Sequence, residues 1–198
     1  VLGRLRQEKD DTHTIVYIHN TPAIVDAVRL QQFDIGIVSR SPPYLGVHSL
    51  YQTEVNYVAL VPQNHSLAAS KDRLDLREVA GREEFITFGN VYPLEMQGMD
   101  EDLAAQFQNK ARYSVANVLA ATALVRAVGV PALVDPFSAR MSASAGGMVV
   151  RPIQQKLTYH IGIITRGIEV MNRETRQLAD ALISKFEADP LTVAAGQS

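Results

Sequence analysis

The sequence contains few residues whose type and spacing could carry out catalysis. It has no Gly-x-Ser-x-Gly motif and no two histidines at helical spacing with a glutamate between them, so the usual signatures of acyl transfer and zinc hydrolysis are missing. It has no cysteine, which excludes a thiolate nucleophile, a disulfide framework and cysteine-based zinc sites. A glycine-rich dinucleotide fingerprint is missing as well. We therefore predict a protein that binds without chemistry, uses no metal or cofactor, and is not an enzyme.

The histidines and the acidic clusters do not change this prediction. Carboxylates at Glu83–Glu84 and Asp100–Asp102 would have to face a cleft to act as general acid and base. In the sequence they are typical of a solvated surface or of the start of a helix. The histidines are scattered and lack a second ligand at metal-binding spacing, so solvated or core-edge roles suit them better. They are His13, His19, His48, His65 and His160.

Alternating strands and helices are predicted to position any binding site. Residues 12–19 are rich in β-branched side chains, which favours a strand. Thr21 is a suitable N-cap and Pro22 suits the first helical position, so a helix should run from there to about Gln32. The nearly continuous apolar run 33–38 predicts a parallel strand covered on both faces. The elements expected after it are a ribbon at 47–61, a helix at 75–80, a strand at 85–88, a helix at 93–108, a strand at 111–115, a helix at 118–128, a strand at 131–134, a loose loop at 142–147, a strand at 158–165 and a helix at 169–188.

The residues that could bind a ligand follow the predicted strands, because α/β folds bind ligands beyond the carboxyl ends of their strands. Helices that begin nearby would direct backbone N–H groups and positive dipole ends toward an anionic group. Arg40 could pair with a carboxylate, and Asp135 could receive an amine with Phe137 stacked over it. The candidate ligand-binding residues are Asn20, Thr21, Ser39, Arg40, Phe88, Gly89, Asn90, Asn117, Asp135 and Phe137.

Several of these candidates have simpler explanations that the sequence leaves open. Thr21 and Asn117 could serve only as helix caps. Arg40 lies in a proline-rich loop, where a single arginine is often solvated. Asp135–Pro136 could merely start a turn.

Composition limits the class of protein. The chain has 198 residues, 46% of them hydrophobic and 20% charged, with a net charge of −2, which is typical of a globular protein and not of one that grips nucleic acid by itself. No run approaches the roughly 18 to 20 apolar residues that a membrane helix needs, and no charged-then-apolar leader is present. We expect a cytoplasmic protein that is not in a membrane.

Four stretches together resemble the effector-binding domain of LysR-type bacterial transcriptional regulators. They are residues 33–39, 60–68, 85–89 and 127–137, and in this order and spacing the resemblance extends to about Pro190. The sequence Val134-Asp135-Pro136-Phe137 is also similar to members of the family that respond to opines and amino-acid derivatives.

This resemblance implies an α/β fold like that of periplasmic binding proteins, with two Rossmann-like lobes joined by two crossover strands. Lobe I would combine residues 1–63 with 163–198, and lobe II would span 64–162. A small effector, such as an amino-acid derivative, opine or organic acid, would bind between the lobes and shift an attached winged helix-turn-helix domain on DNA. Family members form homodimers or homotetramers, which here would place a helix at 1–9 and the strand at 12–18 of one subunit against the helix at 118–128 of another.

The chain departs from the family pattern in two respects, and two other functions stay open. It has no DNA-binding domain, and it begins inside the family's first helix, without the strand and loop that normally precede that helix. A solute-binding protein of a transport system would share the fold but need a secretion leader. A small α/β enzyme would need a nucleophile or an acid/base pair in its pocket. A helix-turn-helix upstream in the gene would argue against both.

Overall fold

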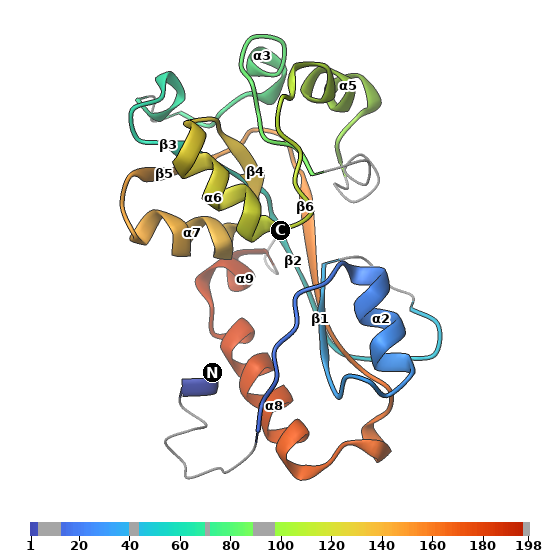
Figure 1. Ribbon diagram of the computed structural model, residues 1–198. Coiled ribbons are helices and arrows are strands. Elements are labelled where there is room, and N and C mark those ends of the chain that lie inside the picture. The colour runs from blue at the N-terminus through green and yellow to red at the C-terminus, as the bar shows by residue number, and fades with distance from the viewer. Residues whose placement is uncertain (4–12, 40–43, 70–71, 89–97, 196–198) are drawn as a thin grey trace. The chain divides into compact units, whose positions relative to one another are not determined.

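The chain forms two compact units. A computed structural model describes residues 1–3, 13–39, 44–69, 72–88 and 98–195 (Figure 1). The first unit combines Val1–Glu54 with His160–Ser198, and the second is the continuous stretch Val55–Tyr159. The lobe limits expected from the sequence, at residues 63 and 162, remain predictions, and the compact units change over at residues 54 and 159.

The first unit is built on a three-stranded sheet in the order β1-β6-β2. These strands are β1 (Gly36–Val38), β2 (His48–Asn56) and β6 (Thr158–Thr165). Helix α2 (Thr21–Arg29) packs on β1, where the buried Val28, Val38 and Ile164 form a small core. Gly36 allows the close approach of α2, because a Cβ atom there would lie 2.6 Å from Cγ2 of Ile24.

Strand β1 differs from the expected parallel strand in two ways. Its partner is β6, which runs antiparallel, with Gly36 opposite Ile164 and Val38 opposite Gly162. Ile37 points away from the core and is 46% exposed. A continuous apolar run therefore does not by itself predict that both faces of a strand are covered, because the coverage depends on the elements that pack beside the strand.

The strand expected at residues 12–19 is not observed, because residues 13–20 have no regular secondary structure. Ile15, Val16 and Ile18 are 61%, 68% and 60% exposed, although the ring of Tyr17 stacks on Phe33 with centroids 5.1 Å apart. β-propensity reflects packing and pairing with a neighbouring strand, and none of the described strands pairs with this segment. The helix expected at 1–9 falls largely on residues 4–12, outside the described residues.

Helix α2 begins one residue earlier than expected. Its N-cap is Asn20, whose Oδ1 accepts a hydrogen bond from the Ala23 N–H at 3.0 Å, so Thr21 is the first helical residue. The helix ends at Arg29 rather than near Gln32. The chain then turns through Gln31, which has a positive φ of 57°, and a non-glycine residue takes this conformation only in a turn or under constraint.

The second unit contains a sheet in the order β4-β3-β5. Strand β3 (Val58–Pro62) pairs antiparallel with both β4 (Ala132–Val134) and β5 (Met148–Pro152). Alternate residues of β3 enter two different cores, because successive side chains of a strand point to opposite faces: Ala59 and Val61 enter one and Leu60 the other. The first core also holds buried residues of α3 (Leu76–Val79) and α5 (Glu101–Lys110). The second also holds those of α6 (Val118–Val128) and α7 (Pro136–Ser144).

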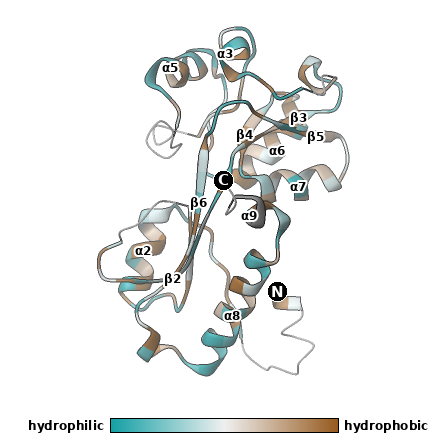
Figure 2. Ribbon diagram, turned by 180° about the vertical axis from the view of Figure 1, so that it is seen from behind, coloured by the Kyte–Doolittle hydropathy of each residue, from teal (hydrophilic) through white to brown (hydrophobic). Residues whose placement is uncertain are grey.

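Other boundaries differ from the sequence predictions. The loop expected at 142–147 was partly wrong, because residues up to Ser144 belong to α7. Strand β5 was not predicted, and the expected strand at 111–115 consists of an isolated bridge between Ser114 and Thr87. The part of the expected helix at 93–108 that lies before Gly98 falls outside the described residues. The closing region contains a 3₁₀ turn η3 (Ile168–Val170), the amphipathic helix α8 (Arg173–Glu187), in which Figure 2 shows both hydrophilic and hydrophobic residues, and α9 (Pro190–Ala195).

Asp75 ties the start of α3 to a distant part of the chain. Its Oδ1 accepts hydrogen bonds from the Gln155 side chain at 2.7 Å and from the Arg77 N–H at 2.9 Å. Gln155 in turn accepts a hydrogen bond from the Leu76 N–H at 2.9 Å. The Gln155 hydrogen bond, followed by that of the Arg77 backbone, lowers the pKa of Asp75.

The pKa of Asp75 predicts an acid-sensitive contribution to stability. A carboxyl group whose pKa is lower in the folded state stabilises the fold above its unfolded pKa, about 4, and loses that contribution as the pH falls through the folded value. We expect Asp75→Asn, which keeps the acceptor oxygen but removes the charge, to lose less stability than the wild type between neutral pH and pH 3. Urea unfolding at both pH values measures this, with Asp180→Asn on α8 as the control. Equal losses in wild type and Asp75→Asn would refute it.

Candidate functional site

In the first unit, two candidate residues come together at the carboxyl end of β1. Thr21 is buried, and its Oγ1 lies 3.3 Å from Oγ of Ser39, although the two residues are 18 positions apart in the sequence. The same Oγ1 accepts a hydrogen bond from the Ser39 N–H at 3.3 Å. The first turn of α2 is thus hydrogen-bonded to the residue that follows β1. This is the position, beyond the carboxyl end of a strand, at which α/β folds bind ligands. Of the other two candidates in this unit, Asn20 caps α2 and Arg40 lies outside the described residues.

In the second unit, three candidates follow segments that run parallel to one another. Ile86 bridges Ala132 and Thr87 bridges Ser114, both in the parallel sense. Backbone hydrogen bonds complete the arrangement, from Thr87 N–H to the Tyr113 carbonyl at 3.0 Å and from Val115 N–H to the Thr87 carbonyl at 2.9 Å. Because parallel segments end at the same edge, the chain places Phe88, Asn117 and Asp135 along one edge of this unit. Gly89 and Asn90 lie outside the described residues.

The side chains of Asn117 and Asp135 cap the helices that begin there. Asn117 Oδ1 accepts a hydrogen bond from the Ala120 N–H at 2.9 Å. Asp135 is buried, and its Oδ1 accepts hydrogen bonds from the N–H groups of Phe137 at 3.1 Å and Ser138 at 2.8 Å. The cap formed by Asn117 agrees with the simpler alternative that the sequence left open, whereas Asp135–Pro136 opens a helix instead of the expected turn. Ligand contacts by either residue remain predictions.

Phe137 lies in the first turn of α7, next to a residue that the sequence prediction missed. The guanidinium carbon of Arg140 is 5.9 Å from the centroid of the Phe137 ring, within the range of a cation–π contact. Residues three positions apart are neighbours on a helix, so a predicted helix at 136–144 would have paired Arg140 with Phe137. Arg140 adds a positive charge beside Phe137, one turn after the start of α7.

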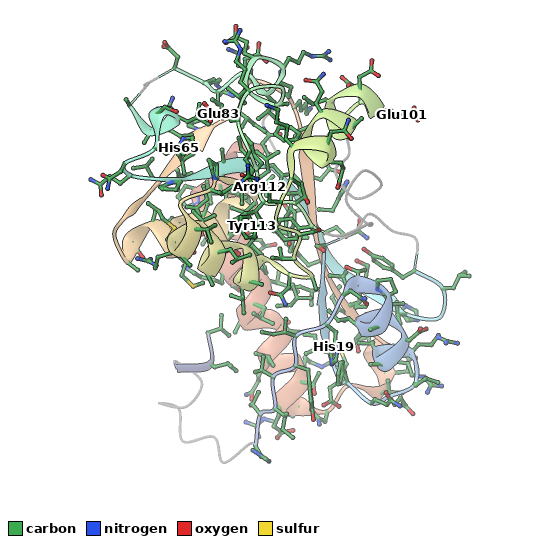
Figure 3. All side chains as sticks on the ribbon, turned by 45° about the horizontal axis from the view of Figure 1, so that its top comes forward. His19, His65, Glu83, Glu101, Arg112 and Tyr113 are labelled. Carbon is green, nitrogen blue, oxygen red and sulfur yellow. The ribbon has the colours of Figure 1, made fainter. Side chains whose placement is uncertain are left out.

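Two histidines have acidic neighbours that their sequence spacing did not reveal. His65 Nε2 lies 3.8 Å from a carboxylate oxygen of Glu83, and Figure 3 shows the two residues close together in the second unit. His160 Nδ1 lies 3.1 Å from Oε1 of Glu54. Within the described part of the chain, no three histidine, cysteine or acidic side chains converge in a way that could hold a metal ion.

Ser66 and His65 do not form a nucleophile with an imidazole base. Ser66 Oγ lies 3.4 Å from Nδ1 of His65, but that nitrogen already accepts a hydrogen bond from the Leu67 N–H at 3.2 Å. A neutral imidazole has one acceptor nitrogen, so the nitrogen facing Ser66 is occupied in capping the 3₁₀ turn η1 (Ser66–Ala68). The other ring nitrogen faces Glu83, so the imidazole offers the hydroxyl no free acceptor, and Ser66 Oγ instead donates a long hydrogen bond to Oε1 of Glu83 at 3.5 Å.

Comparison with known proteins identifies the family. The chain belongs to the LysR substrate binding domain family, whose model matches residues 1–187. The expected effector-binding domain of a LysR-type regulator and its periplasmic-binding-protein-like α/β fold are thereby confirmed, and the transporter and enzyme alternatives are not favoured. A comparison with curated proteins gave no match. Within the described residues, no helix has the length and apolar character needed to cross a membrane.

Solved structures show the same fold at low sequence identity. The regulatory domain of CcmR from Synechocystis PCC6803, in complex with 2-PG, is 13% identical with a TM-score of 0.70, over 93% of this chain and 88% of that one. The regulatory domain of MetR from N. meningitidis is 19% identical with a TM-score of 0.61, over 93% and 84%. The effector binding domain of QuiR in complex with shikimate is 18% identical with a TM-score of 0.62, over 93% and 89%.

Proposed function

We propose that this domain binds a small effector carrying an anionic group between its two lobes, and that it does not transform the effector. The single observation that carries the proposal is that, in each unit, a helix begins at the carboxyl end of a strand or parallel segment. These helices are α2 beside Ser39, α6 at Asn117 and α7 at Asp135. Each contributes the positive end of its dipole.

The hydroxyl pair of Thr21 and Ser39 supports a ligand with hydrogen-bonding groups. The two hydroxyls lie 3.3 Å apart at the start of α2, and each can donate one hydrogen bond and accept others. A carboxylate with a second polar group, as in amino-acid derivatives, opines and organic acids, matches this combination of donors and positive dipoles. We take these compounds as the effector class to test.

The role in gene regulation follows from the family. Binding would favour one arrangement of the lobes over another and so alter how the attached winged helix-turn-helix domain contacts DNA, which requires different affinities for the two arrangements. We propose a homodimer or homotetramer in the cytoplasm. The exposed apolar side chains Ile15, Val16 and Ile18, together with Leu119 and Val128 of α6, support contact between subunits.

A thermal-shift screen tests the effector class. The compounds are amino acids, opines and organic acids, each compared with its methyl ester, in which the carboxylate charge is removed. A ligand at 100 times its dissociation constant should stabilise the domain by about 2.7 kcal/mol. For a domain of this size that corresponds to a rise in melting temperature of roughly 5–10 °C. The proposal fails if only the esters, which lack the carboxylate, raise the melting temperature.

A pair of variants tests where the effector binds. Thr21→Val removes the buried hydroxyl at nearly constant volume and should weaken binding of an anionic effector by about tenfold or more. Ser184→Ala removes an exposed hydroxyl from α8 in the same unit and should leave binding unchanged. Calorimetric titration of both variants gives the affinities directly, so a change in the stability of Thr21→Val alone does not affect the result. Equal affinities in both variants would contradict the assignment of Thr21.

A further inference from the structure

Two neighbouring strands carry the chain from one unit to the other. Strand β2 passes from the first unit into the second after Glu54, and β6 returns into the first unit at His160. The two strands are neighbours in the sheet order β1-β6-β2 (Figure 1). Any change in the arrangement of the units must therefore deform these two strands near residues 54–57 and 157–160.

A side-chain pair joins the two strands on the side of the first unit. His160 Nδ1 lies 3.1 Å from Oε1 of Glu54, and the His160 side chain is 11% exposed while that of Glu54 is 61% exposed. A carboxylate can only accept hydrogen bonds, so Nδ1 must carry a proton in this contact. The contact is a charge-assisted hydrogen bond held on one side by a buried ring.

A second set of contacts joins the strands on the side of the second unit. The rings of Tyr57 and Tyr159 meet edge to face, with centroids 5.2 Å apart. The Tyr57 N–H donates a hydrogen bond to the Leu157 carbonyl at 2.8 Å. Both residues of the tyrosine pair lie within the second unit.

We propose that Glu54 and His160 are positioning residues that reinforce the backbone pairing of the two crossing strands at the boundary between the units, so that the strands bend there as one hinge. The tyrosine pair fixes the strands on the other side, which confines the bend to Val55 and Asn56 on β2 and to the backbone between Tyr159 and His160 on the returning strand. The inference rests on the proposed function, since a hinge has a role only if effector binding changes the arrangement of the lobes. The hinge would transmit the change in lobe arrangement that effector binding causes.

Matched substitutions separate the hydrogen bond from general effects on the fold. The amide nitrogen of Asn occupies nearly the position of histidine Nδ1, whereas that of Gln lies nearer Nε2, so His160→Asn keeps the donor and His160→Gln displaces it. Likewise, Glu54→Gln keeps the acceptor oxygen and Glu54→Ala removes it. Glu187→Ala, which removes an exposed carboxylate at the end of α8, is the control.

Amide hydrogen exchange of the ligand-free 198-residue chain measures the opening of the crossing strands. We expect Glu54→Ala and His160→Gln to accelerate exchange in residues 54–57 and 157–161 by about tenfold, the effect of losing a hydrogen bond to a charged group. Glu54→Gln and His160→Asn should stay within about twofold of the wild type, because the neutral hydrogen bond is weaker but present. Glu187→Ala should match the wild type, and exchange in β3 should not change in any variant.

Three results would overturn the inference. The first is unchanged exchange in Glu54→Ala and His160→Gln, and the second is equal acceleration in His160→Asn and His160→Gln. The third is acceleration that extends equally into β3. Because no effector is present, these results are independent of the ligand screen. An absence of ligand-induced stabilisation would contradict the proposed function, whereas the exchange results named above would contradict the hinge inference.

Discussion

Replacing Phe85 with alanine is expected to lower the free energy of unfolding by about 3–5 kcal/mol. The side chain is 1% exposed, and its ring meets that of Phe107 edge to face with centroids 4.9 Å apart. Alanine would remove the ring from the core between the sheet and α5 and leave a cavity, whose cost adds to the lost transfer free energy. Urea unfolding of wild type and variant measures the difference.

A graded substitution provides the control for Phe85. Phe85→Leu keeps most of the volume and should cost clearly less, about 1–2 kcal/mol. A loss below about 1 kcal/mol for Phe85→Ala would show that the core collapses around the missing ring, and would contradict a rigid packing role. The substitution also tests the site indirectly, because residue 85 begins the segment that leads to Phe88.

Gly36→Val is expected to destabilise the first unit by about 3 kcal/mol, at the upper end of the range for overpacking. A Cβ at residue 36 would lie 2.6 Å from Cγ2 of Ile24 and 3.1 Å from side-chain atoms of Val28 and Ile164. Ile24 is β-branched and in a helix, so its side chain has little freedom to move aside. Helix α2 would have to shift away from β1, and the contact between Thr21 and Ser39 would open with it.

Four further variants test this explanation for Gly36: Gly81→Ala, Gly36→Ala, Ile24→Ala and the combination of the last two. Gly81→Ala places a Cβ 3.6 Å from the nearest side-chain atom, which is ordinary contact, and should change stability little. Combining Gly36→Ala with Ile24→Ala should cost less than the sum of the single changes, because the smaller side chain makes room for the new methyl group. Additive losses would show that the clash with Ile24 is not the cause. Chemical denaturation of the four variants supplies the values.

Local signals in the sequence were sufficient to predict the position of some helices and strands. The helix expected at 118–128 is observed as Val118–Val128, with Asn117 as its cap, because its apolar periodicity and capping residue agree. Helix α7 was missed, since it is short and its serines and Phe137 have weaker helix propensity than its alanines. It forms because buried Asp135 caps it and Ala139 packs in the core, and neither burial is visible in a local pattern.

The candidate site was predictable as a set of chain positions and not as a set of interactions. The rule for strand ends selected Thr21 and Ser39 separately, but their contact depends on how closely α2 approaches β1 at Gly36. The rule also selected Asn117 and Asp135, whose side-chain oxygens are partly used in helix caps. Arg140 was missed because its contact with Phe137 needed the helix that the sequence reading lacked.

The chain order of the two units sets the order in which they can mature on the ribosome. The second unit is one uninterrupted stretch, Val55–Tyr159, whereas the first needs both ends of the chain. Its β1 pairs with residues 162–164 of β6, which leave the ribosome after the whole second unit. Since domains generally fold as they are synthesised, the middle of the polypeptide is expected to be structured first, and the amino-terminal part must wait for its carboxyl-terminal strand.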